Sequence, residues 1–162
     1  MNGIQYALRR VHGGENELGN ALLQLAERHR VDHEVHHVAR DLATWSHRHV
    51  RLIAECGARF ELELDDEPAT PHNAGRHVRE AVAAAVGRRP EPGLLLLEDL
   101  QDLYLRAAEN SLAWELVAQV AQAKSHAELL ELTQQCHPQT LRQVRWANTM
   151  IKVLSPQILS SM

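Results

Sequence analysis

The sequence has few aromatic residues, little cysteine and no excess of basic charge. Aromatic residues make up 4% of the 162 residues, which favours helices over sheets. Two cysteines are too few for a disulfide framework. The formal net charge is −4, which excludes a general nucleic-acid-binding protein. No apolar run reaches the roughly 18 residues of a membrane span, and residues 1–8 lack the features of a signal peptide. We therefore expect a cytoplasmic protein that binds neither nucleic acid nor membrane.

What the sequence does contain is helical periodicity. Apolar residues recur at spacings of three and four over residues 35–53, 96–121 and 129–154. An earlier segment is interrupted by Gly13 and Gly14. The first helix either begins near Gly3 and accommodates both glycines where helices pack closely, which we favour, or begins at Glu15. The pattern predicts one all-α domain over residues 1–162.

Residues 60–93 differ in character from the rest of the chain. An acidic run is followed by prolines and by a short alanine-rich stretch, about residues 77–86, which predicts one minor helix. We interpret this segment as a connection between two helix pairs, residues 3–58 and 94–155. A connection of this length can run the length of a helix, which allows a topology with parallel second and third helices.

The two predicted helix pairs resemble each other without a gap when the chain is shifted by 94 residues. The identical pairs include Glu15/Glu109, Leu18/Leu112, Leu22/Leu116, Glu34/Glu128 and Val50/Val144. Two helical hairpins related by a pseudo-twofold axis form a four-helix bundle. If that axis crosses the bundle, the two hairpin turns lie at opposite ends.

The second half also resembles a known family. The segment Leu103-Tyr104, Ala108-Glu109-Asn110, Ser125, Leu129, His137-Pro138-Gln139-Thr140 and Gln143-Val144 is similar to the stress-associated YciE/YciF type of the ferritin-like superfamily. The resemblance implies a ferritin-like four-helix bundle. Such bundles hold two iron or manganese ions with one glutamate from each of two helices and a Glu-x-x-His motif from each of the other two.

Only part of that ligand set is carried over to this chain. Glu109 matches the family's third-helix glutamate, Glu15 is its repeat partner, and His47 occupies one histidine position. The two Glu-x-x-His glutamates would fall at Thr44 or Trp45 and at Pro138 or Gln139, and the remaining histidine position falls near Leu141. The resemblance therefore implies a degenerate di-iron site. We expect a non-catalytic stress-related or interaction protein without a cofactor, acting as a homodimer or with an unknown protein partner.

Two alternatives involve metal. Glu15, His47 and Glu109, with His137, could form a reduced site for iron, manganese or zinc in a metal-binding protein or oxidoreductase. His33-Glu34-x-x-His37 formally matches the zinc-hydrolase motif, in which the two histidines bind zinc and the glutamate is the general base. The eleven histidines otherwise indicate polar clusters at a hairpin turn and hydrogen-bonded side chains within the bundle. Cys56 and Cys136 are expected to lie too far apart for a disulfide.

Overall fold

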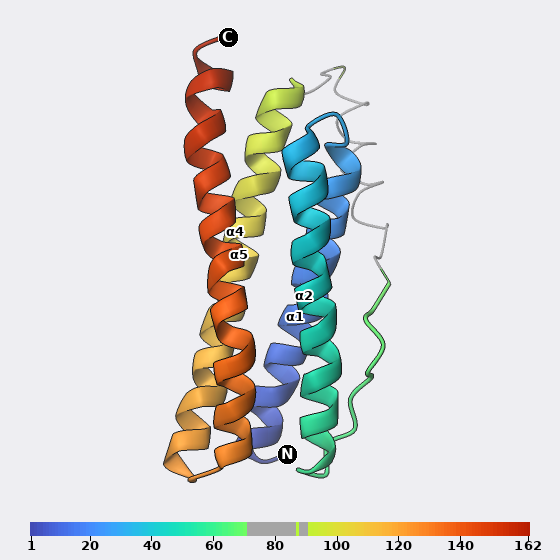
Figure 1. Cartoon of the computed structure of the whole chain (residues 1–162), viewed down its shortest axis with the longest axis vertical. Coiled ribbons are helices and arrows are strands. Elements are labelled where there is room, and N and C mark those ends of the chain that lie inside the picture. Colours follow the sequence, from blue (N-terminus) through green and yellow to red (C-terminus); the bar gives the residue numbers. More distant parts are fainter. Residues whose placement is uncertain (71–86, 88–90) are drawn as a thin grey trace.

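The computed structural model describes residues 1–70, 87 and 91–162 (Figure 1). This part of the chain contains four long helices and no strand, so the prediction of an all-α four-helix bundle is confirmed. The predicted short helix at residues 77–86 lies outside the described residues. The helices are α1 (Gly3–Arg28), α2 (His33–Ala58), α4 (Pro92–Ala123) and α5 (Ala127–Leu159).

The helices form two antiparallel hairpins. α1 and α5 run in one direction and α2 and α4 in the other, so the turns at residues 29–32 and 124–126 lie at opposite ends of the bundle (Figure 1). α1 packs extensively against both α2 and α4, and α5 packs mainly against α4. Residues 60–70 return along the bundle, where His12 Nε2 donates to the carbonyl of Asp65 and Ala69 N donates to Asn16 Oδ1, both at 2.8 Å. The long connection is thus tied to α1.

The helix ends and the glycines of α1 follow from local chemistry. Asp32 caps α2 by accepting a hydrogen bond from Val35 N at 3.0 Å. α1 continues through Gly13 and Gly14, as we favoured from the sequence. A Cβ atom at Gly14 would lie 2.3 Å from Asn110 Oδ1, so glycine at this position lets α4 approach α1.

Two hydrophobic clusters fill the bundle, one at each end. The first contains Leu8, Ile53, Val117 and Leu129, near the free end of α1 and the turn between α4 and α5. The second contains Leu22, Ala43, Leu100 and Met150, toward the other end. Leucine, valine and isoleucine supply the burial that holds the helices together, at about 25 cal/mol per Å² of apolar surface removed from water.

The predicted shift of 94 residues matches the burial pattern of α2 with that of α5, but it does not match α1 with α4. On α2 and α5 a shift of 94 residues pairs buried positions with buried positions, among them Ser46 with Thr140 and His49 with Gln143. On α1 and α4 the same shift pairs the buried Leu18 with Leu112, which is 67% exposed. A shift of 95 restores the match and pairs Glu15 with Asn110, both buried. The reason is the turn, which spans residues 29–32 in the first hairpin but only 124–126 in the second.

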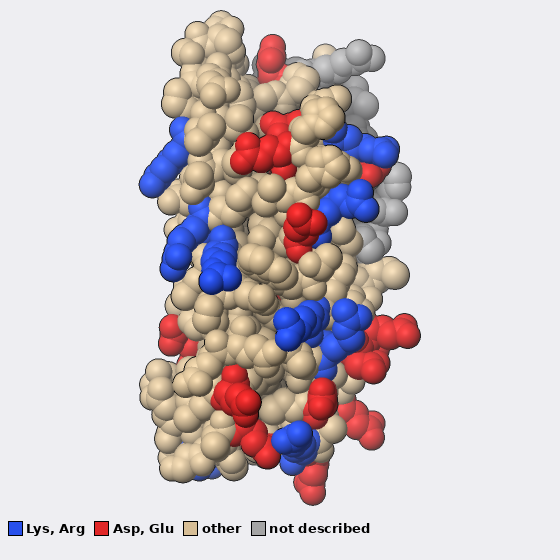
Figure 2. Space-filling model, viewed as in Figure 1, with Lys and Arg blue, Asp and Glu red and all other residues tan. Residues whose placement is uncertain are grey.

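The outer surface carries mixed charge. Figure 2 shows basic and acidic side chains interspersed on the face of the bundle seen in Figure 1. In the described part of the chain, no helix combines the length and the hydrophobicity that crossing a membrane requires.

Candidate functional site

Buried polar side chains separate the two hydrophobic clusters on every helix. Between the clusters, each helix directs one or two polar side chains to the interior. The side chains of Trp114 and Gln139 lie beside these groups and hydrogen-bond to them. Together these residues are Glu15 on α1, Ser46 and His49 on α2, Asn110 and Trp114 on α4, and Gln139, Thr140 and Gln143 on α5. We call these eight residues the central polar layer. Burying so many polar groups costs stability unless they are hydrogen-bonded, so this layer is the candidate functional site.

The carboxylate of Glu15 is the centre of the layer. Glu15 is fully buried, and its Oε1 accepts hydrogen bonds from three helices. The donors are His49 Nδ1 at 2.9 Å, Trp114 Nε1 at 2.8 Å and Thr140 Oγ1 at 3.2 Å. Oε2 has no hydrogen-bond partner in the described protein. Thus one oxygen of one carboxylate holds α1, α2, α4 and α5 together at mid-height.

Glu15 and His49 form a buried ion pair. Burial alone would raise the pKa of Glu15, but the hydrogen bond and charge of His49 outweigh it and lower that pKa from its ordinary value. Burial alone would lower the pKa of His49, but hydrogen bonds to Cys136 and Glu15 raise it to about 10. His49 Nε2 also meets an acceptor, Gln139 Oε1, at 2.7 Å. Because both ring nitrogens face oxygen, the geometry suits an imidazolium.

Neutral groups of the layer join α2 to α5 through hydrogen bonds. Gln143 Nε2 donates both to the carbonyl of Leu42 and to Ser46 Oγ, each at 3.0 Å. The ring of His49 meets the ring of Trp114 edge to face, with centroids 6.0 Å apart. Ser46 also lies near Glu15 and helps to lower its pKa. All residues of the layer except Asn110 therefore belong to one network, which spans the bundle from α4 to α5.

Asn110 stands apart from this network. It is 2% exposed, and neither its Oδ1 nor its Nδ2 has a hydrogen-bond partner in the described protein. It packs against Gly14 and lines a cleft between α1 and α4. A buried amide without partners is costly and requires an explanation.

The corrected register shows which residues occupy the inward positions of this bundle at the level of Glu15, the positions at which a di-iron bundle would carry its ligands. They are Glu15 on the first helix, Ser46-x-x-His49 on the second, Asn110 on the third and Thr140-x-x-Gln143 on the fourth. A carboxylate-bridged centre needs a carboxylate at four of these six positions and histidine at the other two. Only Glu15 and His49 are of ligand type here, and they bond to each other. Trp114 Nε1, which can only donate, occupies the same carboxylate oxygen. The donor set does not fit a dinuclear metal centre.

The residues that the sequence suggested as metal ligands lie in different surroundings. Glu15 is in the central polar layer, whereas Glu109 is on the surface and pairs with Arg10 at 3.0 Å. His137 bonds to Ser111 Oγ at 2.8 Å. His47 is half-buried, and burial lowers its pKa with help from the charge of Arg51. Across the described ranges, no three histidine, cysteine, aspartate or glutamate side chains are grouped so that they could hold a metal ion.

The second suggested site lies on the outer face of α2. His33, Glu34 and His37 are exposed, and the rings of His33 and His37 stack with centroids 6.2 Å apart. The structure brings His37 and His47 to the same surface cleft of about 270 Å³, which also includes Arg40, Asp41 and Thr44. The buried interior positions on α2 and α5 are those of Ser46 and Thr140, rather than Thr44 or Trp45 and Pro138 or Gln139, to which the resemblance assigned the glutamates.

No family model, curated protein or solved structure matches this chain. The function is therefore inferred from the central polar layer and from the surface around it. The layer could have been found from the sequence by one signal: polar residues spaced by three within a buried apolar stripe, at Ser46 and His49 and again at Thr140 and Gln143.

Proposed function

We propose that this chain is a ferritin-like four-helix bundle in which a charged hydrogen-bond network replaces the dinuclear metal centre. The observation that carries the proposal is positional. The inward positions of all four helices are polar and buried at one level, and Glu15 with His49 neutralise each other there without an ion. The protein would act without catalysis, through contacts of its surface, in the stress-related role that the family resemblance implies. Its two free, buried thiols suit the reducing cytoplasm.

Metal analysis tests this proposal directly. Tag-free protein expressed with iron, manganese and zinc supplied should contain none of them at stoichiometric levels by inductively coupled plasma mass spectrometry. A variant that restores the ligand set should take up about two iron or manganese ions per chain, because the backbone already places those positions around one centre. Metal should also raise its melting temperature, since the ion binds only the folded state. The variant carries Ser46→Glu, Asn110→Glu, Thr140→Glu and Gln143→His.

A matched control removes the two original ligand residues from the same variant. With Glu15→Gln and His49→Gln added, uptake should fall well below two ions per chain. Stoichiometric metal in the wild-type protein that is lost in Glu15→Gln would contradict the proposal. So would a restored variant that folds, as judged by circular dichroism, yet takes up no metal.

The expected homodimer has a surface that suits it. Leu105, Leu112 and Leu116 share one face of α4 and are 64%, 67% and 45% exposed. We propose that two copies pack along this leucine stripe, because burying such side chains from water stabilises an assembly. Light scattering coupled to size-exclusion chromatography should give twice the 18.3 kDa chain mass. Leu112→Glu should shift the mass to that of a monomer.

A control for this test lies elsewhere on the surface. Leu159, at the end of α5, is 56% exposed, so Leu159→Glu adds the same charge outside the stripe and should leave the dimer intact. A wild-type chain that remains monomeric at all accessible concentrations would exclude the dimer.

A further inference from the structure

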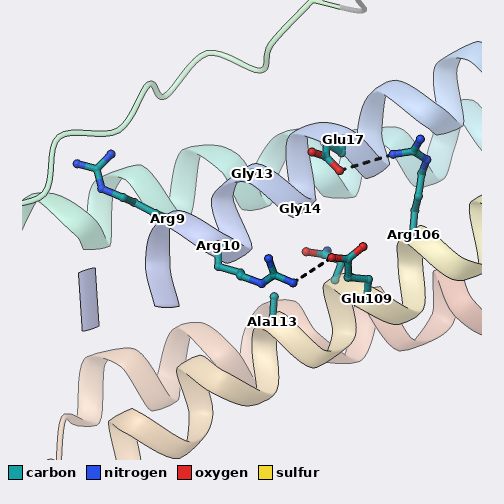
Figure 3. A pocket seen from close by; sticks show the side chains of 9 residues that line it. Arg9, Arg10, Gly13, Gly14, Glu17, Arg106, Glu109 and Ala113 are labelled. Carbon is teal, nitrogen blue, oxygen red and sulfur yellow. Dashed lines mark hydrogen bonds and ion pairs between the residues drawn. The ribbon is translucent and has the colours of Figure 1, made fainter. Parts of the chain in front are cut away.

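The cleft beside Asn110 is the strongest unexplained feature outside the ion pair. It has a volume of about 240 Å³ and lies between α1 and α4 (Figure 3). That is below the roughly 300–1,000 Å³ of pockets that take drug-sized ligands, so it suits a small metabolite. Its lining contains three arginines, two glutamates and the backbone of Gly13 and Gly14.

The side chain of Asn110 is the strongest reason to expect a ligand in this cleft. Its amide is nine-tenths buried or more, lines the cleft and has an unused donor and an unused acceptor. Leaving such buried groups unpaired lowers the stability of the fold. Gly14 leaves room for the amide, and a Cβ atom at Gly13 would meet no other atom within 4 Å. The floor of the cleft thus contains an amide that the protein leaves unpaired, and Gly14 packs against its oxygen.

The walls of the cleft favour an anion. Arg10 pairs with Glu109 at 3.0 Å, and Arg106 pairs with Glu17 at 3.6 Å, so the two ion pairs bridge α1 and α4 (Figure 3). Arg9 has no ion-pair partner among residues 1–70, 87 and 91–162, which leaves one positive charge in excess. Both ion pairs are exposed, so each contributes little to the stability of the fold. Their guanidinium groups can therefore turn to a ligand at little cost.

We propose that this cleft binds a small organic anion that carries a hydroxyl group. The carboxylate or phosphate of the ligand binds to the arginines at the rim. Its hydroxyl group, one donor and one acceptor, bonds to the amide of Asn110 on the floor after this side chain, whose polar atoms are covered in the free protein, turns toward the cleft. This function is separate from the loss of the metal centre, and neither requires the other.

Nuclear magnetic resonance titration of the full chain tests the binding. The probes are malate and glycerol 3-phosphate, which carry a hydroxyl beside a carboxylate or a phosphate, and glycerol is the neutral control. The side-chain amide signals of Asn110 should shift saturably with at least one anion and not with glycerol. A response to malate alone assigns a carboxylate ligand, and a response to glycerol 3-phosphate alone assigns a phosphate ligand. Binding of neither anion, or equal binding of glycerol, overturns the proposal.

Three substitutions locate the site. Gly13→Leu adds a side chain to the lining of the cleft at a position where its Cβ atom meets no other atom within 4 Å, and it should weaken binding at least tenfold. Gly3→Leu makes the same change in the same helix, also with nothing within 4 Å, and should leave binding unchanged. Asn110→Leu keeps the shape of the side chain but removes the amide, so it should weaken binding at least tenfold and raise the melting temperature. Unchanged affinity in Gly13→Leu overturns the proposal, as does an Asn110→Leu protein that binds normally and melts earlier.

Discussion

Replacing Glu15 by glutamine should lower the free energy of unfolding by about 3–5 kcal/mol, the loss expected when one partner of a buried ion pair is removed. Glutamine keeps an oxygen that accepts from Trp114 and Thr140, so the variant removes the charge and little else. His49 is then left in the core without its counter-ion. Urea denaturation near pH 6, followed by circular dichroism, gives the change from the midpoint at an unchanged slope.

A neighbour on the same helix supplies the control. Glu17→Gln makes the identical chemical change two residues away, where the carboxylate is exposed and pairs with Arg106 at 3.6 Å. Its cost should be below about 1 kcal/mol. An apolar double variant, Glu15→Leu with His49→Leu, should lose less stability than the sum of the two single variants, because it leaves no unpaired charge. Equal costs for Glu15→Gln and Glu17→Gln would show that the buried pair does not stabilise the bundle.

The architecture could be read from the sequence because it depends on patterns that local chemistry enforces. Apolar residues at spacings of three and four over residues 35–53, 96–121 and 129–154 predicted the helices. The similarity of the two halves gave two hairpins with turns at opposite ends. None of these inferences required knowing which residues meet across the bundle.

The interior side chains of α1 and α4 were harder to predict, because a difference of one residue between the two turns decides which positions correspond. The second turn is one residue shorter than the first, and one residue on a helix rotates a side chain by about 100°. That rotation moves Glu109 to the surface and Asn110 inside. The identities that suggested a gapless repeat misled here, since Leu112 and Leu116 are exposed while their counterparts Leu18 and Leu22 are buried.

His49 also shows why residue type alone was insufficient. From the sequence, His47 and His49 were both plausible interior side chains on one helix. The apolar stripe that contains Val35, Leu42 and Ile53 includes position 49 and excludes position 47. The hydrogen bonds of His49 to Glu15 and Gln139 join three helices. They depend on tertiary packing, which the periodicity of the sequence does not reveal.

The stability of the protein should fall as pH rises from about 6.5 to 10, and His49 should be responsible for a large part of that fall. In the unfolded chain histidine has its ordinary pKa near 6.5, whereas in the bundle the pKa of His49 is about 10. Below pH 6.5 both states hold the proton and the stabilisation is complete. Between these values only the folded state holds it, so each pH unit removes up to about 1.4 kcal/mol, a total on the order of 5 kcal/mol.

At acid pH the stability of the protein should change in the opposite direction, because there it depends on the protonation of Glu15. The pKa of Glu15 is lowered in the folded state, so its contribution is present above the ordinary carboxyl pKa and is lost as pH falls through the lowered value. The pair should therefore stabilise the bundle most between about pH 4.5 and 6.5.

Two histidine variants separate the effect of His49 from general titration. Urea denaturation at pH 6, 7, 8 and 9 should show a smaller loss of stability with rising pH in His49→Gln than in the wild type. His47→Gln is the control, because the pKa of His47 is lowered in the fold and its contribution is lost only as pH falls below about 6.5. That variant should keep the wild-type slope between pH 7 and 9. Parallel profiles for the wild type and His49→Gln would mean that His49 is neutral in the bundle, and the network around Glu15 would then be held by Trp114 and Thr140 rather than by charge.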